Sequence, residues 1–120
     1  EGGAAARRVG GSGAGRKPVP SIPDGYPGRE AGLSACRTWL EKNGLLDRLS
    51  RLSDDHSGDE YVVAKCLAEG GFAETSIRAV LDDGRPAAAK WHQRGEDYRT
   101  RTVRNAIRDA ADDPHVRWSA

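Results

Sequence analysis

Hydrophobic residues recur every three or four positions through most of this chain, which is the spacing of amphipathic helices. The strict alternation of apolar and polar residues that marks a half-buried strand is absent, and Tyr61, Val62 and Val63 form the only β-like run. We therefore expect an all-α fold, a small bundle of five or six short helices. The expected core residues are Leu33, Trp39, Leu40, Leu45, Leu46, Leu49, Leu52, Tyr61, Val62, Val63, Leu67, Phe72, Ile77, Val80, Leu81, Trp91, Tyr98, Val103 and Ile107.

Glycine, proline and capping residues predict where these helices begin and end. Ser57 and Glu60 fit a capping box, in which the serine caps the helix and the glutamate reaches back to its start. Glycines follow several apolar stripes and stop them, and Pro86 suits the first turn of a short helix that includes Trp91. The other expected helices cover residues 33–40, 45–52, 59–69, about 74–82 and about 96–111.

The first 29 residues differ from the rest of the chain, since they hold eight glycines and four prolines but few large apolar side chains. Such a stretch cannot bury enough surface to offset the entropy of ordering it. We expect residues 1–29 to be a disordered arm or linker before a helical domain at residues 30–120. The arm carries five basic and two acidic residues, so it is either a plain linker or an arm that touches phosphates.

Charge and length exclude several classes of protein. Lys and Arg number 19 and Asp and Glu number 18, so the chain is neither a polycation nor an acidic tail. No apolar run approaches the roughly 18 residues that span a bilayer. Cys36 and Cys66 form no C-x-x-C pair, which favours reduced thiols and a cytoplasmic location. Because the chain starts at Glu1 and has no Met, we expect a fragment or processed product of a larger protein.

No catalytic, cofactor or metal site is expected from the motifs. The glycine-rich stretch 10–17 departs from a P-loop, because Arg16 precedes Lys17 and Pro18 follows it. The histidines and cysteines lack the spacing of zinc ligands. Paired aspartates can hold Mg²⁺, but their places at helix ends and in loops favour turn-forming, solvated roles. The histidines are His56, His92 and His115, and the pairs are Asp54-Asp55, Asp82-Asp83 and Asp112-Asp113.

The expected helices at 59–69 and 74–82 have the lengths of a helix-turn-helix, with Gly70-Gly71-Phe72 as the turn. A recognition helix should offer basic or amide groups to the bases. The second helix instead carries more acidic than basic groups, with Arg78 its only arginine. An ordinary helical hairpin is therefore the favoured interpretation.

The last helix carries the strongest sign of function. At about 100° per residue, Arg101, Arg104 and Arg108 fall within an arc of roughly 60°, away from the apolar face. Such a row suits contact with a nucleic-acid backbone; the alternative is a solvated face on which Arg101 pairs with Asp97 and Arg108 with Asp112. The predicted nucleic-acid-binding residues are Arg94, Arg99, Arg101, Arg104 and Arg108. Trp91, Tyr98 and Trp118 could stack on bases, although Trp91 and Tyr98 also suit the core.

One order of features resembles a known family. Asp59-Glu60-Tyr61 opens a helix, the turn reads Leu67-Ala68-Glu69-Gly70-Gly71-Phe72, and the last helix holds Asp97-Tyr98-Arg99-Thr100-Arg101-Thr102-Val103. Over residues 45–111 this resembles the small helical region that follows the catalytic core of archaeo-eukaryotic-type plasmid and phage replication primases, and it is similar to segments of related replication and mobilisation proteins. One departure is Ala73, where the family pattern favours Ser or Thr with Pro.

The resemblance implies an accessory module and not an enzyme, because the acidic metal-binding residues of such primases belong to a catalytic domain that this chain lacks. The module would help to bind template or nucleotide, or would connect primase to helicase. A different class fits the sequence as well: a protein-interaction module or small structural subunit of a larger assembly, with Trp118 a candidate for an exposed apolar patch. The expected partner is thus nucleic acid or another protein, with no membrane or small-molecule substrate.

Overall fold

The computed structural model describes residues 18–52, 58–114 and 116, and within this part of the chain it contains helices and no strand beyond one isolated bridge. The prediction of an all-α bundle is confirmed. The six helices are α1 (Leu33–Lys42), α2 (Leu46–Ser50), α3 (Gly58–Glu69), α4 (Glu74–Gly84), α5 (Lys90–Gln93) and α6 (Glu96–Asp112).

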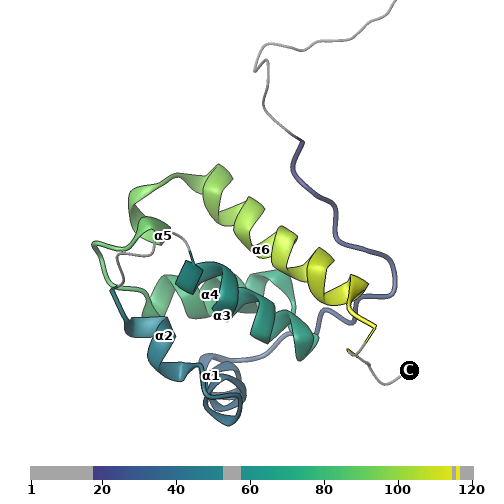
Figure 1. Cartoon of the computed structure of the whole chain (residues 1–120), viewed down its shortest axis with the longest axis horizontal. Helices are drawn as coiled ribbons and strands as arrows, with labels where there is room; N and C mark the ends of the chain where they lie inside the picture. Colours follow the sequence, from purple (N-terminus) through teal and green to yellow (C-terminus); the bar gives the residue numbers. More distant parts are fainter. Residues whose placement is uncertain (1–17, 53–57, 115, 117–120) are drawn as a thin grey trace, which may run out of the picture.

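The middle of the bundle is formed by α3 and α4. Figure 1 shows these two helices between α6 on one side and α1 and α2 on the other. The longest helix, α6, packs chiefly along α3 and also touches α4, whereas α1 and α2 contact α3 and α4. No helix among the described residues is both long and apolar enough to cross a membrane. The side of α6 that faces away from α3 and α4 is therefore not covered by another helix.

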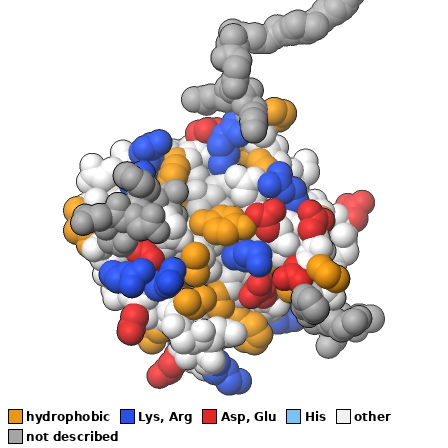
Figure 2. All heavy atoms as spheres, in the orientation of Figure 1, with side chains coloured by type: hydrophobic (Ala, Val, Ile, Leu, Met, Phe, Trp, Pro, Cys, Tyr) orange, Lys and Arg blue, Asp and Glu red, His pale blue; other side chains and the backbone are white. Residues whose placement is uncertain are grey.

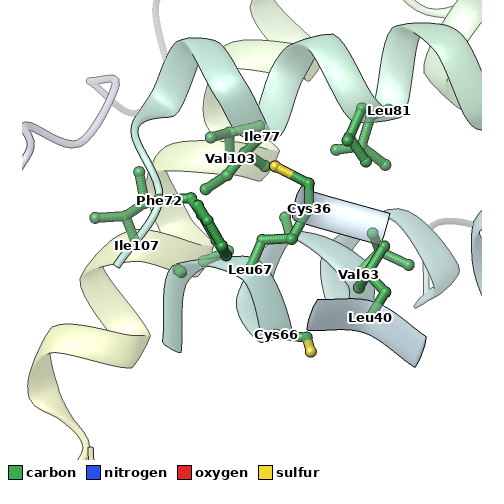
Figure 3. Packing of buried hydrophobic residues seen from close by; sticks show 14 of the residues in the cluster. Cys36, Leu40, Val63, Cys66, Leu67, Phe72, Ile77, Leu81, Val103 and Ile107 are labelled. Carbon is green, nitrogen blue, oxygen red and sulfur yellow. The ribbon is translucent and has the colours of Figure 1, made fainter. Parts of the chain in front are cut away.

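The core is built from apolar side chains of α1, α3, α4 and α6 (Figure 3). The sulfur of Cys36 points towards Ile77 and Val103, whereas that of Cys66 points away from them, and both thiols are free. The core prediction is wrong for two residues, since Leu33 is 39% exposed and Leu52 is 59% exposed. Leu33 is the first residue of α1 and Leu52 follows the end of α2, so each lies at the edge of the packed helices.

Most helix boundaries differ from the prediction by one or two residues, and the start of α5 and the end of α4 have a clear physical reason. The helix expected from Pro86 begins at Lys90, because the Pro86 carbonyl accepts a hydrogen bond from the Ala89 amide (2.9 Å) and closes a turn first. Gly84, expected as a stop, is the last residue of α4. A Cβ at this position would lie 2.5 Å from Cδ2 of Leu49, so the glycine allows α2 to approach α4 closely.

The chain before α1 lies against the bundle. Ile22 and Tyr26 pack on the core, and the Tyr26 hydroxyl donates to the Phe72 carbonyl. The Arg29 amide donates to Gly71 O (2.8 Å), and its carbonyl accepts from the Ala73 amide (2.7 Å). The expected arm ended at residue 29; its residues 18–29 thus have a place on the fold because two apolar side chains and one backbone bridge hold them. Its residues 1–17 lie outside the described part.

The start of α4 explains how Ala73 is tolerated there. Ala73 is the N-cap and makes no side-chain cap hydrogen bond. The Glu30 carboxylate instead accepts from the hydroxyls of Thr75 (2.7 Å) and Ser76 (3.4 Å) in the first turn. A carboxylate beside a helix N-terminus interacts favourably with the helix dipole. Glu30 therefore supplies, from outside the helix, part of what the cap residue lacks.

A buried ion pair joins α3 to the end of α4. The side chains of Glu60 and Arg85 are 0% and 2% exposed, and the guanidinium Nη2 of Arg85 pairs with the carboxylate. The Tyr98 hydroxyl donates to the same carboxylate (3.2 Å). Nη1 of Arg85 donates to the carbonyls of Arg48, Leu49 and Arg51 (2.9, 2.8 and 2.8 Å) at the end of α2. Glu60 thus turns inward instead of reaching back as a capping residue; its expected cap partner, Ser57, lies outside the described residues.

Candidate nucleic-acid interface

The helix α6 has one apolar face and one polar face, as the sequence predicts. Its buried residues are Thr102, Val103, Ala106, Ile107 and Ala110, which face the other helices. Glu96 and Asp97 occupy its first turn, where acidic groups interact favourably with the helix dipole. Because the apolar face points inward, Arg101, Arg104 and Arg108 lie on the outward side of α6.

Two adjoining hollows run along this outward side. They measure about 570 and 410 Å³, and both are lined by Arg101 and Asn105. The first also contains Arg94 and Tyr98, and the second also contains Arg108. Because positions three and four apart share one helix face, Tyr98, Arg101, Asn105 and Arg108 form a single stripe, and Arg94 joins it from the turn between α5 and α6. We call the stripe formed by Arg94, Tyr98, Arg101, Asn105 and Arg108 the α6 groove.

Arg94 and Arg108, at the two ends of the α6 groove, have the most exposed guanidinium groups. Arg94 is exposed and lies over the Tyr98 ring, 5.4 Å from its centroid. The Arg108 side chain is half exposed, and its Nη2 lies 3.6 Å from Asp109 Oδ1. The predicted pairing of Arg108 with Asp112 is replaced by this looser pair with its neighbour. Ion pairs as exposed as this contribute little, so a stronger anion could take the guanidinium.

Arg101 and Arg104 are engaged more closely. Nε of Arg101 donates to Asp97 Oδ2 at 2.8 Å, which confirms the predicted local pair. Nε of Arg104 donates to Glu74 Oε2 at 3.1 Å and so bridges α6 to α4. Each also donates from Nη1 to a backbone carbonyl before α1, Arg101 to Pro18 (3.3 Å) and Arg104 to Pro20 (3.4 Å).

The fifth predicted residue, Arg99, points elsewhere. Its Nη1 donates to the Trp91 carbonyl at 2.7 Å, and its Nε lies 3.7 Å from Glu96 Oε1. Arg99 therefore fastens α5 to α6 and does not line the groove. The structure brings Arg94, Arg101 and Arg108 together, places Arg104 beside Pro20 at the edge, and separates Arg99 from them.

Acidic groups share the same surface. Asp97 lines the first hollow, and Asp109 lines the second together with Tyr61. The Tyr61 hydroxyl donates to Asp109, and burial together with that hydrogen bond raises the pKa of Tyr61 to about 12. Sequence reasoning placed Tyr61 in the core and missed its contact with the groove. Figure 2 likewise shows Lys and Arg side chains intermingled with Asp and Glu on the face it displays. The groove is thus a narrow track and not part of a broad basic field.

The polar residues of α4 pair with side chains from other parts of the chain, which favours the helical-hairpin interpretation over a helix-turn-helix reader. Nη2 of Arg78 donates to Glu96 Oε1 (2.7 Å), and this pairing lowers the pKa of Glu96 to about 2. Asp83 accepts from Arg37 (2.7 Å), and Asp82 accepts from Nε1 of Trp91 (2.7 Å). Trp91 is fully buried, so it is a core residue and cannot stack on a base.

Metal ligation finds no support within the described residues, because no three His, Cys, Asp or Glu side chains gather there. His92 lies on α5 with Nε2 3.2 Å from the Arg85 carbonyl. Asp82 and Asp83 have the partners given above, and Asp113 lies 3.9 Å from Nζ of Lys65. The other residues weighed for metal binding or stacking, Asp54, Asp55, His56, His115 and Trp118, fall outside the described part.

Comparison with known proteins assigns no family to this chain. The resemblance to the helical region of replication primases rests on the residues quoted above, and the geometry of the α6 groove stands independently of it. No protein-family model, no curated protein and no solved structure matches the chain.

Proposed function

We propose that this protein is a non-catalytic helical module of a DNA replication or mobilisation protein, and that it contacts nucleic acid through the α6 groove. The observation that carries the proposal is the placing of Arg94, Arg101 and Arg108 along one groove, with Asn105 between the last two. The proposed setting is the cytoplasm, in keeping with two free, buried thiols.

The chemistry of these side chains suits phosphates. Guanidinium groups donate several hydrogen bonds in a fixed fork, and charge-assisted bonds to phosphate are about twice as strong as neutral ones. Arg101 and Arg108 lie seven residues apart, which is about 10.5 Å along a helix. The Asn105 amide between them can both donate and accept. The groove can therefore hold a chain of phosphates at intervals along its length.

A single strand fits this groove better than a duplex does. Proteins that bind single strands use a positively charged groove that follows one backbone. Duplex readers instead insert an exposed helix or ribbon into the major groove. Here α6 is packed on α3 and α4 along its apolar face. The groove on its other side holds three arginines and two aspartates, Asp97 and Asp109, so its net positive charge is small. Few phosphate contacts, and hence modest affinity, are expected.

The test is fluorescence anisotropy with a labelled short single-stranded oligonucleotide and with its duplex, over a range of salt concentrations. The variant Arg94→Gln/Arg108→Gln removes two groove cations whose partners are weak. The matched control, Arg37→Gln/Lys42→Gln, removes two exposed cations from α1. Each phosphate contact on a single strand contributes about 0.7 to the slope of log K against log salt.

We expect the groove variant to bind the single strand more weakly and to lose about 1.4 from that slope. The α1 control should keep both its affinity and its slope. Equal losses in the two variants would mean that overall charge, and not the groove, attracts the strand. Absence of binding to either form of DNA at low salt would end the nucleic-acid proposal.

A second candidate function, a protein-interaction module, is favoured by Leu33 and Leu52, the two most exposed large hydrophobic residues among those described. Contiguous apolar patches left in solvent mark docking surfaces, and these two leucines are the candidates to belong to one. Such a module should bind its partner in a salt-tolerant manner. Replacing Leu52 by Ser should then weaken the association, whereas the groove variant should leave it unchanged.

A further inference from the structure

The segment before α1 has two parts that differ in how they are held. At residues 26–31 it is anchored firmly: the Tyr26 hydroxyl donates to Phe72 O, Arg29 pairs through its backbone with Gly71 and Ala73, and the Ala31 amide donates to Ser76 Oγ (2.9 Å). Arg29 also lies over the Phe72 ring, 5.8 Å from its centroid. This part belongs to the fixed body of the fold.

At residues 18–20 the contacts are of another kind. The carbonyls of Pro18 and Pro20 accept long hydrogen bonds, 3.3 and 3.4 Å, from Arg101 and Arg104. Both prolines also line the second hollow of the α6 groove, beside Arg108. Figure 1 shows the start of this segment running past the C-terminal half of α6 on its way to α1. The segment thus occupies two arginines that a phosphate would use.

A turn separates the two parts. The Tyr26 amide donates to Pro23 O at 3.3 Å, and Gly25 within this turn has φ +86° with open space around it. Glycine adopts this left-handed conformation without strain, and it can leave it as easily. Rotation at the turn would move residues 18–23 away from α6 and take Ile22 off the core, while the anchor at residues 26–31 stays in place.

We propose that residues 18–23 form a strap that competes in cis with a phosphate-bearing strand for the α6 groove, an inference that rests on the function proposed above for that groove. The strap offers neutral carbonyls, which bind guanidinium groups more weakly than phosphate does. Its short tether gives it an effective concentration that is roughly millimolar, so it can still hold the arginines when ligand is scarce. Proline also stiffens it in an extended form, which lowers the entropy cost of docking.

The test loosens the strap in the full chain with the variant Pro18→Gly/Pro20→Gly. Added backbone freedom favours the released strap, and two such changes should raise ligand affinity about fivefold or more if the strap competes. The control is Pro114→Gly, a proline beyond the end of α6 that is exposed and lies outside the groove. The two probes are a short single-stranded oligonucleotide and inorganic tripolyphosphate, each titrated by NMR at low salt. The heteronuclear NOE at the Val19 and Ile22 amides follows release of the strap directly, because it falls when a segment becomes mobile on the ps–ns timescale.

Tighter binding of both probes to the strap variant, with a lower heteronuclear NOE at Val19 and Ile22 when ligand is added to the unaltered chain, supports the proposal. Tighter binding of tripolyphosphate alone also supports it, while the nucleic-acid function fails. Equal or weaker binding by the strap variant overturns the proposal of a competing strap and leaves the proposed function in place. Weaker binding would mean that the two prolines form a wall of the ligand site. If neither probe binds any of the chains, both proposals are overturned.

Discussion

The pair formed by Glu60 and Arg85 should be one of the most sensitive points of the fold. Replacing Arg85 by Met keeps much of its volume but removes the charge and every donor. The Glu60 carboxylate would remain buried with the Tyr98 hydroxyl beside it, and three carbonyls at the end of α2 would lose their shared donor. Leaving one buried partner of an ion pair without the other costs about 3–5 kcal/mol.

That cost is a large share of the total, since small domains are stable by about 5–15 kcal/mol. In urea, with a slope near 1.5 kcal/mol per molar, a loss of about 4 kcal/mol lowers the unfolding midpoint by roughly 2.5 M. The matched control is Arg37→Met, which breaks the exposed pair with Asp83. Exposed pairs contribute about 0–1 kcal/mol, so the midpoint of this control should barely move.

The double variant Glu60→Met/Arg85→Met adds a second check. Replacing both partners of a buried pair by apolar residues is often close to neutral, so the double variant should be more stable than Arg85→Met alone. Urea unfolding followed by far-ultraviolet circular dichroism gives all three values. If Arg85→Met and Arg37→Met shifted the midpoint equally, the pair would not be holding α2 to α3 and α4, and this reasoning would be refuted.

Two further predictions concern a pair of tyrosines and a glycine. Burial raises the pKa of Tyr26, and burial together with the hydrogen bond to Asp109 raises the pKa of Tyr61 to about 12. Absorbance of tyrosinate should therefore rise in transitions above pH 10, and Tyr61→Phe should remove the transition near pH 12. Because both folded pKa values exceed the unfolded value near 10, their stabilising effect is complete below pH 10 and should fall as the pH rises from 10 towards 12; constant stability over that range would contradict the assignment. Gly84→Ala should destabilise by about 1–2 kcal/mol, since overlap with Leu49 outweighs the better helix propensity. In a Leu49→Ala background the same change should be neutral or stabilising, and an unchanged loss there would exclude the overlap as its cause.

The local pattern predicted most of the fold. Apolar spacing and the glycine stops gave the six helices, and α6 matches its expected range to within one residue. The prediction is wrong or incomplete where a residue far away in the sequence determines how a side chain is oriented. Glu60 follows the capping pattern but faces Arg85, which is 25 positions away and carries no local sign of burial. Tyr26 sits in a glycine- and proline-rich stretch, and its hydroxyl donates to the carbonyl of Phe72, 46 positions on, which no local pattern could indicate.

The candidate site shows the same division. Helical geometry alone placed Arg101, Arg104 and Arg108 on the outward face of α6 and predicted the pair of Arg101 with Asp97. It could not place Arg99 against the Trp91 carbonyl, because that depends on the turn between α5 and α6. Nor could it find the bond of Arg104 to Glu74, which lies on another helix and 30 positions earlier.

These partners order the arginines by how readily a ligand could reach them. Arg94 and Arg108 are held by a ring face and by an exposed neighbouring carboxylate, so a phosphate can engage them without breaking the fold. Arg101 and Arg104 each hold a carboxylate and a strap carbonyl, so each can turn its Nη1 from the strap to a phosphate only as the strap leaves. A strand would therefore first contact the two ends of the α6 groove and then displace the strap from its middle. Binding in that order should show one weak, salt-sensitive step followed by a slower step, and the slower step should disappear in the Pro18→Gly/Pro20→Gly variant.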